Sequence, residues 1–236
     1  MLPFTVVIPA YNESDKIEST VLRVKQTGLT EDIVVIDDGS SDDTKERAER
    51  AGAKVISLGR VYGVGAALRA GFHSVKSRAS VIVVMAGNNK DEPKEIPKLL
   101  EALQQGADFV QGSRYLVGGR AQGGMPIYRR VATRIHPILF SFFVGKKVTE
   151  STNGFRAFRT ALLEDPRIDL NQKWLDHYEL EPYFLFKVIT LGYSHTEVPV
   201  TKTYPPRGQT YTKMRPFSGW WSLLRPIFIL GLRLRR

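Results

Sequence analysis

The chain has 236 residues, of which 42% are hydrophobic and 25% are charged, as in an ordinary globular protein. This composition excludes a disordered or collagen-like chain, and the length suits one larger α/β domain or two small ones. Because the sequence contains no cysteine, it also excludes disulfides, thiolate metal sites and a cysteine nucleophile.

The formal net charge is +10, and the excess of Lys and Arg lies in two stretches. Residues 109–149 contain seven Lys and Arg, residues 198–236 contain eight, and neither stretch contains an acidic residue. Such asymmetry indicates an anionic partner, either a nucleic acid, a phosphorylated small molecule or a membrane surface. No nucleic-acid reader motif is present, so we do not expect nucleic-acid binding.

The first half of the chain alternates strand-like and helical patterns. The expected elements, in chain order, are a strand at 4–9, a helix at 14–26, a strand at 32–37, a helix at 41–51, a strand at 54–57, a helix at 63–75, a strand at 80–85 and a helix at 95–104. Strands separated by helices predict a Rossmann-like, mainly parallel sheet flanked by helices. In such sheets, ligands bind beyond the carboxyl ends of the strands.

The second half is less regular. Its patterns predict strands at 108–113 and 195–200, a helix at 178–191, a loop at 204–210 and amphipathic helices at 126–144 and 218–236. The last segment combines Trp and aliphatic residues with terminal arginines, which suits either a helix on an anionic membrane or one packed on the domain. We find no secretory leader and no stretch of about 20 apolar residues, so we expect a cytoplasmic protein.

Polar residues follow three of the predicted strands, in the loops 9–13, 37–44 and 86–91. A carboxylate at a strand end can accept hydrogen bonds from a base or a ribose, and an aromatic ring can stack on the base. Each loop alone is weak evidence for a nucleotide site, because a sequence such as Asp-Asp-Gly-Ser is also a common turn and helix cap.

Several motifs occur in a characteristic order. They are Val-Val-Ile-Pro-Ala-Tyr-Asn-Glu at 6–13, Val-Val-Ile-Asp-Asp-Gly-Ser-Ser-Asp-Asp-Thr at 34–44, Gly-Ser-Arg-Tyr at 112–115, Thr-Asn-Gly-Phe-Arg-Ala-Phe at 152–158 and Glu-Val-Pro-Val at 197–200. Together they resemble the family 2 glycosyltransferases of GT-A fold, and most nearly the dolichol-phosphate mannose synthases and other polyprenyl-phosphate glycosyltransferases. The resemblance implies one GT-A domain over 1–236, with a nucleotide-binding half (1–108), an acceptor-side half (109–217) and a basic amphipathic C-terminal helix (218–236).

The same resemblance implies a site for a nucleotide-diphosphate sugar, linked to GDP or UDP. The residues that it assigns to this site are Pro9, Ala10, Tyr11, Glu13, Ile36, Asp38, Gly65, Gly87, Asn88, Lys90, Arg114, Arg207 and Lys213. Of these, Arg114, Arg207 and Lys213 are expected at the phosphates. Cations suit this place because the diphosphate gains charge as it leaves the sugar.

The family's Asp-x-Asp motif, which holds a divalent metal, here reads Ala86-Gly87-Asn88. One neutral amide is a poor ligand for Mg²⁺ or Mn²⁺. Three interpretations remain open. The metal site could be rebuilt on Asn88 and Asp91, the enzyme could be metal-independent and use Lys90 and the arginines, or the protein could be an inactive nucleotide-sugar-binding relative.

An acceptor hydroxyl needs a general base, whereas an acceptor phosphate is already ionised. The candidate catalytic residues are Asn88, Asp91, Glu150, Asp176 and Glu179. Glu179 could equally be a helix-start charge. Arg129, Arg130 and Arg134 are expected at an acceptor phosphate or a membrane.

We therefore expect an inverting glycosyltransferase that acts on a polyprenyl phosphate, with peripheral contact to the cytoplasmic face of a membrane. The alternatives are a soluble transferase for a hydroxyl acceptor (a saccharide, nucleoside or natural product) and an inactive binding module. The sequence leaves the donor and the oligomeric state open.

Overall fold

The computed structural model describes residues 3–206, 213–214 and 217–234. The strands are β1 (Phe4–Ala10), β2 (Ile33–Asp37), β3 (Lys54–Ser57), β4 (Val81–Val84), β5 (Phe109–Ser113), β6 (Arg120–Gly123), β7 (Arg156–Arg159), β8 (His195–Pro199) and β9 (Thr201–Tyr204). The α-helices are α1 (Ser14–Lys25), α2 (Thr44–Arg50), α3 (Val64–Val75), α4 (Ile96–Gln104), α5 (Ile127–Val144), α6 (Leu180–Thr190) and α7 (Ser218–Gly231). Short 3₁₀ turns lie at Pro93–Glu95, Thr160–Glu164 and Lys173–Leu175.

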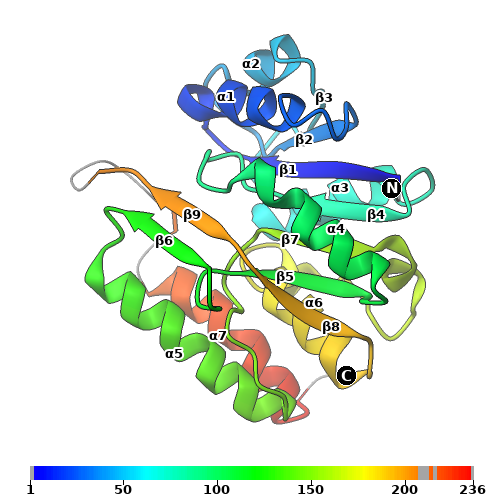
Figure 1. The fold of residues 1–236 in the computed structure, drawn as a ribbon, viewed down its shortest axis with the longest axis vertical. Helices are drawn as coiled ribbons and strands as arrows, with labels where there is room; N and C mark the ends of the chain where they lie inside the picture. Colours follow the sequence, from blue (N-terminus) through cyan, green and yellow to red (C-terminus); the bar gives the residue numbers. More distant parts are fainter. Residues whose placement is uncertain (1–2, 207–212, 215–216, 235–236) are drawn as a thin grey trace.

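Among the described residues, seven strands form the central sheet in the order β3-β2-β1-β4-β7-β5-β8 (Figure 1). β1 pairs in parallel with β2 and β4, β2 with β3, and β5 with β8. The predicted mainly parallel sheet flanked by helices is therefore confirmed. The carboxyl ends of β1, β2 and β4 lie at one edge of this sheet, which brings their three polar loops together.

The sequence patterns missed three strands. β7 is antiparallel to both of its neighbours, β4 and β5, and overlaps the end of the 152–158 segment that we assigned only as a family motif. β6 and β9 pair in parallel as a separate ribbon that extends beyond the sheet on the side of α5 (Figure 1). Each of the three has four residues and polar or charged side chains, so none produces an apolar run. The predicted loop at 204–210 starts within β9, and residues 207–210 lie outside the described residues.

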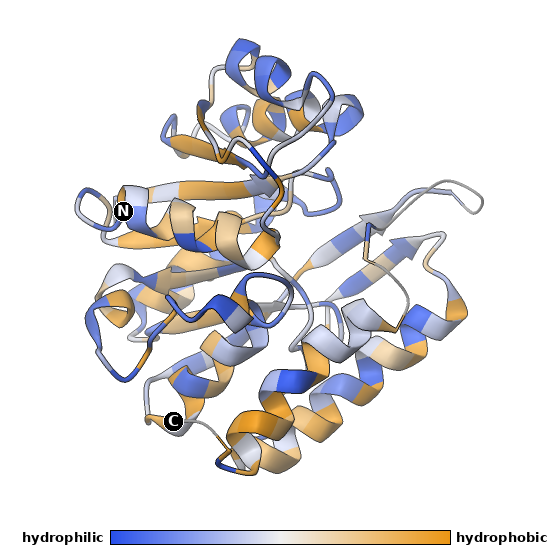
Figure 2. Ribbon diagram, turned by 180° about the vertical axis from the view of Figure 1, so that it is seen from behind, coloured by the Kyte–Doolittle hydropathy of each residue, from blue (hydrophilic) through white to orange (hydrophobic). Residues whose placement is uncertain are grey.

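The core has two layers because alternate side chains of a strand point to opposite faces of the sheet. On β1, Val7 packs in the layer that contains α3 and α6, whereas Val6 and Ile8 pack in the layer that contains α1, α2 and α4. The strands between these layers are mostly hydrophobic (Figure 2). This double burial explains the continuous apolar runs of the first half of the sequence.

α7 packs on the domain through Leu223, Ile227 and Leu230. It is held to α5 by His136, whose Nε2 lies 3.1 Å from the carbonyl oxygen of Leu223 and whose Nδ1 lies 2.7 Å from the Ser151 hydroxyl. Burial lowers the pKa of His136, which favours the neutral ring at neutral pH. Since a carbonyl only accepts, Nε2 donates to Leu223 and Nδ1 accepts from Ser151.

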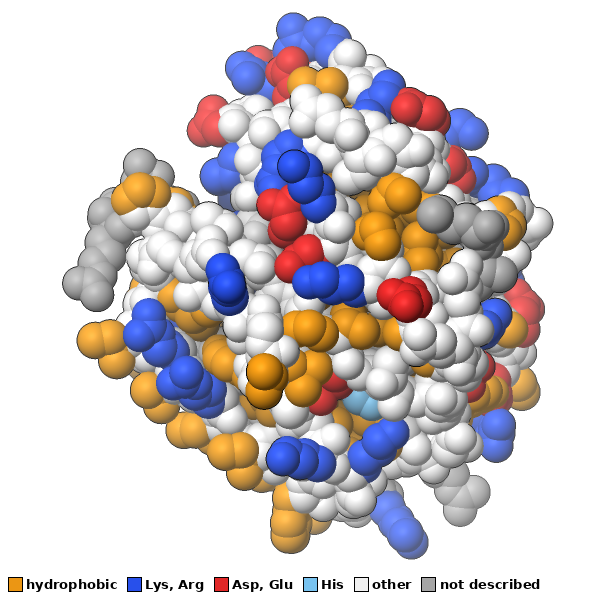
Figure 3. Space-filling model, in the orientation of Figure 1, with side chains coloured by type: hydrophobic (Ala, Val, Ile, Leu, Met, Phe, Trp, Pro, Cys, Tyr) orange, Lys and Arg blue, Asp and Glu red, His pale blue; other side chains and the backbone are white. Residues whose placement is uncertain are grey.

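α5 buries one face and exposes an apolar stripe on the other. The stripe consists of Ile127, Val131, Ile135, Ile138 and Phe142, which are 49–79% exposed and recur every three or four residues. In the space-filling view, hydrophobic side chains project along the edge of the molecule where α5 lies, with Lys and Arg beside them (Figure 3). Within the described part of the chain, no helix is long and apolar enough to cross a membrane.

The antiparallel strand β7 is anchored by Phe158. Its ring meets Phe72 and Phe184 edge-on, with centroids 5.1 and 4.9 Å away, and stacks on Phe109 at 5.9 Å. All four rings are buried. This cluster joins β5 and β7 to the helices α3 and α6.

We expect Phe158→Ala to lower the free energy of unfolding by about 3–5 kcal/mol, because it leaves a cavity in this cluster. Urea denaturation followed by circular dichroism measures the change. Phe142→Ala, at a side chain that is 79% exposed, is the control and should change stability by less than about 0.5 kcal/mol. A loss below about 1 kcal/mol for Phe158→Ala would contradict this account of β7.

Candidate active site

The loops after β1, β2 and β4 contact one another directly. The backbone N–H of Asp38 donates to the Ala10 carbonyl at 2.9 Å, and the N–H of Gly87 donates to the Pro9 carbonyl at 3.2 Å. The N–H of Glu13 donates to the Thr44 hydroxyl at 2.7 Å. The predicted polar loops thus form one continuous edge, with Ile36 buried in the strand beneath them.

Asp38 closes the turn that leads into α3. Its carboxylate accepts hydrogen bonds from the backbone N–H groups of Tyr62 and Gly63, both at 2.8 Å. Burial raises the pKa of Asp38, and these two hydrogen bonds oppose that rise. The carboxylate therefore shapes the 60–63 turn, and its predicted contact with a nucleoside remains a prediction.

Gly65 allows a second turn to approach the start of α3. A Cβ atom at Gly65 would lie 1.9 Å from the Leu175 carbonyl oxygen, and the N–H of Ala66 donates to the Asp176 carbonyl at 3.0 Å. The Asp176 carboxylate forms an ion pair with Arg69. The Asp176 carboxylate, which we predicted as a base, is therefore held in an ion pair with Arg69 of α3.

Lys213 reaches the loop after β1 from near the far end of the chain. Its Nζ donates to the carbonyl oxygens of Tyr11 and Asn12 and lies 3.2 Å from Glu13 Oε1. It also lies 5.6 Å from the centre of the Tyr11 ring. The structure therefore brings three of the predicted nucleotide-site residues together, while Arg207 lies outside the described residues.

The loop after β4 is fastened to β9. The N–H of Thr203 donates to the Lys90 carbonyl at 2.9 Å, and Asp91 forms a backbone bridge with Lys202. Asp91 is 2% exposed: its Oδ1 lies 2.6 Å from Lys202 Nζ, and its Oδ2 accepts from the N–H of Ala86 at 3.1 Å. Lys202 Nζ also donates to Asn153 Oδ1 at 2.9 Å.

Cations converge beside this loop. Lys90 is 7% exposed and lies 5.7 Å from the centre of the Tyr204 ring. Burial, together with the charges of Lys202 and Arg129, lowers the pKa of Lys90 to about 7. An anion with several charges would relieve both the burial and the mutual repulsion of these side chains.

These residues do not fit a divalent metal site. Ala86 offers no ligand, and both carboxylate oxygens of Asp91 already have partners. Asn88 Oδ1 is buried and accepts no hydrogen bond among the described residues, but one neutral oxygen does not satisfy a hard cation. The described part of the chain contains no group of three or more His, Asp or Glu that could hold a metal ion.

Arg114 and Glu150 form a buried ion pair. Arg114 Nε donates to Glu150 Oε2 at 2.7 Å, and Oε1 accepts from the N–H and hydroxyl of Thr152 at 2.9 and 2.8 Å. Arg114 also donates to the Tyr204 hydroxyl. Burial alone would raise the pKa of Glu150, but Arg114 and the hydrogen bonds lower it overall. Glu150 therefore stays ionised and positions Arg114, rather than being free to act as a base.

Glu179 is 3% exposed, and one of its oxygens lies 3.5 Å from Arg225 on α7. Its other oxygen, Oε2, is buried and has no hydrogen-bond partner among the described residues. Glu179, a predicted catalytic carboxylate, therefore has one oxygen that accepts no hydrogen bond from the described residues, whereas both oxygens of Glu150 accept hydrogen bonds.

The three α5 arginines differ in exposure and in their neighbours. Arg129 is half-buried, and its charge acts on Lys90. Arg130 and Arg134 are exposed, and Arg134 lies 5.4 Å from the centre of the Tyr115 ring. Arg129 thus belongs to the cation group beside the β4 loop, and the other two border the apolar stripe.

Sequence reasoning missed the contribution of β9. Lys202 and Tyr204 are two residues apart and both buried, and they contact the β4 loop and Arg114 respectively. Their alternation with Thr201 and Thr203 was the available signal, but a four-residue strand is too short to make it convincing.

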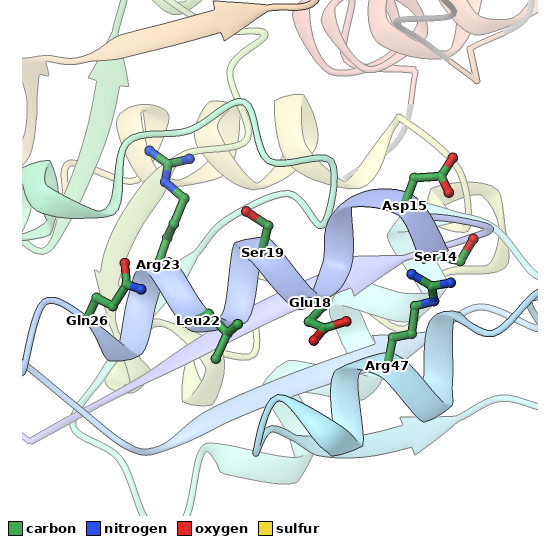
Figure 4. A pocket seen from close by; sticks show the side chains of 8 residues that line it. All are labelled: Ser14, Asp15, Glu18, Ser19, Leu22, Arg23, Gln26 and Arg47. Atoms are coloured by element: carbon green, nitrogen blue, oxygen red, sulfur yellow. The ribbon is translucent and has the colours of Figure 1, made fainter.

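A separate groove of about 330 Å³ runs along the outer side of α1 (Figure 4). It is lined by Ser14, Asp15, Glu18, Ser19, Leu22, Arg23, Gln26 and Arg47. None of the predicted site residues lines this groove, so it is not the site described above.

Comparison with known families identifies the chain. Residues 5–165 match the model of glycosyl transferase family 2. The chain belongs to this family. The predicted family and the predicted glycosyltransferase activity class are both confirmed by this match and by the relatives below.

The relatives of this glycosyltransferase include enzymes named for lipid-phosphate acceptors. Polyprenol monophosphomannose synthase of Mycolicibacterium smegmatis is 33% identical over 205 residues, which are 84% of this chain and 76% of that protein. Undecaprenyl-phosphate mannosyltransferase of Micrococcus luteus is 31% identical over 201 residues, covering 83% and 81% of the two chains. The dolichol-phosphate mannosyltransferase of Pyrococcus furiosus is 33% identical over 175 residues, but the match spans 48% of its length.

Solved structures support the fold. Glucosyl-3-phosphoglycerate synthase from Mycobacterium tuberculosis, in complex with Mn²⁺, UDP and phosphoglyceric acid, gives a TM-score of 0.67 over 96% of this chain and 78% of that chain. The two sequences are 23% identical, so this likeness concerns the fold. The GT-A fold predicted for this glycosyltransferase is confirmed.

We expect Glu150→Ala to cost about 3–5 kcal/mol of unfolding free energy, because it leaves the Arg114 charge buried without a partner. The double variant Arg114→Met, Glu150→Leu should lose less than the single one, because it removes both charges. Urea denaturation measures both. Glu164→Ala, which breaks an exposed pair with Lys76, is the control and should cost less than about 1 kcal/mol. If the double variant were less stable than Glu150→Ala, the proposed role of Glu150 in positioning Arg114 would fail.

Proposed function

We propose that this glycosyltransferase transfers a sugar, with inversion, from a nucleotide-diphosphate sugar to a polyprenyl phosphate. An oxygen of the acceptor phosphate attacks the anomeric carbon, the bond from that carbon to the diphosphate breaks, and the nucleoside diphosphate leaves with the electron pair. The names of the relatives support the acceptor class. The observation that carries the proposal is that α5 bears both an exposed apolar stripe and Arg129, whose charge acts on Lys90 in the β4 loop.

That arrangement suits a lipid phosphate. A polyprenyl chain lies in a bilayer, and its phosphate would reach the protein at the surface that α5 presents. Arg129 and Lys90 would then stand between the acceptor phosphate and the donor diphosphate. Cations at this place stabilise both phosphate groups and the charge that develops on the leaving diphosphate.

The engaged carboxylates also favour a phosphate acceptor. Glu150 and Asp176 are held by Arg114 and Arg69, so neither is poised to take a proton from a hydroxyl. An acceptor phosphate needs no such base. The alternative, a soluble hydroxyl acceptor, would depend on Glu179, whose Oε2 has no partner within the described part of the chain.

We propose further that the α5 stripe rests on the cytoplasmic face of an anionic membrane. Arg130 and Arg134 are exposed on the same helix and would meet lipid phosphates while the stripe enters the headgroup region. On this proposal, residues 1–108 bind the nucleotide and residues 109–217 bind the acceptor. The helix in 218–236 packs against α5.

The acceptor class is tested with radiolabelled GDP- and UDP-linked hexoses and a short polyprenyl phosphate. We expect label in the organic phase with at least one donor and none when the matching polyprenol replaces the polyprenyl phosphate. Glu179→Gln should keep at least about half of the activity, since no base is required. Label confined to a water-soluble product, or none with any donor, would overturn the proposal.

Membrane docking is tested by flotation with vesicles of phosphatidylglycerol and phosphatidylcholine. Replacing Ile138 and Phe142 together with Glu should weaken vesicle binding by at least about tenfold, because two charges enter the apolar stripe. Val117→Glu is the matched control, since Val117 is 99% exposed but lies outside α5. Equal flotation of the stripe variant and the control would exclude the α5 stripe as the docking surface.

A further inference from the structure

The loop after β4 has lost its metal ligands and gained a fixed ammonium group. The family's acidic positions hold Ala86 and Asn88, and the nearby Asp91 is turned into the protein, where it meets Lys202 at 2.6 Å. We propose that Lys202, together with Lys90, supplies the positive charge for the donor diphosphate, so that the nucleotide binds without a divalent metal. This inference rests on the proposed function, because it concerns the same donor site.

Lys202 is held rigidly. Its side chain is 10% exposed, and its Nζ contacts both Asp91 Oδ1 and Asn153 Oδ1. The backbone of β9 is fixed as well, by the bridge from Lys202 to Asp91 and by the hydrogen bond from Thr203 to Lys90. A cation fixed in this way needs no rearrangement when the ligand arrives, which is the condition for effective electrostatic stabilisation.

The balance of charge favours an anion over a second cation at this place. Asp91 compensates Lys202, but Lys90 and Arg129 add two further cations near it. Of the nearby acids, Glu150 is paired with Arg114, and Glu13, whose charge also acts on Lys90, is shared with Lys16 and Lys213. A divalent cation would meet repulsion from these side chains and would have to displace Lys202 from Asp91. A diphosphate would meet attraction from all of them.

Asn88 fits this interpretation. Its Oδ1 is buried and accepts no hydrogen bond from the described residues. A neutral amide oxygen accepts a hydrogen bond from a sugar hydroxyl or an ammonium group without requiring a metal. Asn88 is therefore assigned to the donor as a hydrogen-bond acceptor.

The test measures binding of GDP and of UDP by isothermal titration calorimetry in EDTA, Mg²⁺ and Mn²⁺. We expect the better-bound nucleotide to keep its Kd within about twofold in all three, and Mn²⁺ alone to show no bound fraction by electron paramagnetic resonance. Tighter binding by more than about tenfold in Mn²⁺ would overturn the inference.

Variants locate the charge. Lys202→Met should weaken nucleotide binding in EDTA by at least about tenfold, and Lys202→Arg should restore most of it. Asp91→Asn with Lys202→Met removes both buried charges, so it guards against misfolding and should show the same loss. Lys94→Met is the matched control, because Lys94 is exposed on the same segment and should bind as the parent does. Parental affinity of the double variant in EDTA would overturn the role of Lys202.

The transfer assay separates this inference from the proposed function. If sugar is transferred to polyprenyl phosphate but the nucleotide binds only in the presence of Mn²⁺, the inference is overturned and the proposed function stands. Metal-free nucleotide binding without transfer to polyprenyl phosphate would overturn the function and leave the inference standing. Binding of neither nucleotide under any condition would overturn both.

Discussion

The buried ion pair between Arg114 and Glu150 joins distant parts of the second half of the chain. Arg114 follows β5, Glu150 begins the 150–153 segment, and the Tyr204 hydroxyl on β9 accepts from the same guanidinium. Two charges removed from water are tolerated because each polar atom of Glu150 has a partner. Together with the hydrogen bond from Lys202 to Asn153, this pair ties β9 to the 150–153 segment, beside the contact between Lys202 and Asp91.

The two halves of the molecule meet through β9 and the loop after β4. The first half supplies the loops at the carboxyl ends of β1, β2 and β4, as expected for a nucleotide fold. The second half supplies the cations around them, from β9 and from the first turns of α5. The positive charge seen in the composition is therefore divided. Lys202 is buried and Arg129 half-buried in the candidate site, whereas Arg130 and Arg134 are exposed.

The sequence predicts the first half of the fold well, because β1, β2 and β4 are buried on both faces and read as continuous apolar runs. It misses β6, β7 and β9, whose pairing depends on distant partners and not on local hydrophobicity. In the candidate site, the motifs predicted the three loops and Lys90. They could not reveal that Lys202 forms an ion pair with Asp91, or that Glu150 forms one with Arg114, because both pairs join residues far apart in the chain.

The position of β7 also governs when the sheet can be completed during synthesis. β4 ends at Val84, yet its outer edge is covered only when Arg156–Arg159 has emerged and paired with it. Until then a nascent chain presents a row of unsatisfied backbone groups along β4, which is a template for wrong pairing. Residues 1–108 therefore leave one edge of β4 open until a strand from much later in the chain has paired with it.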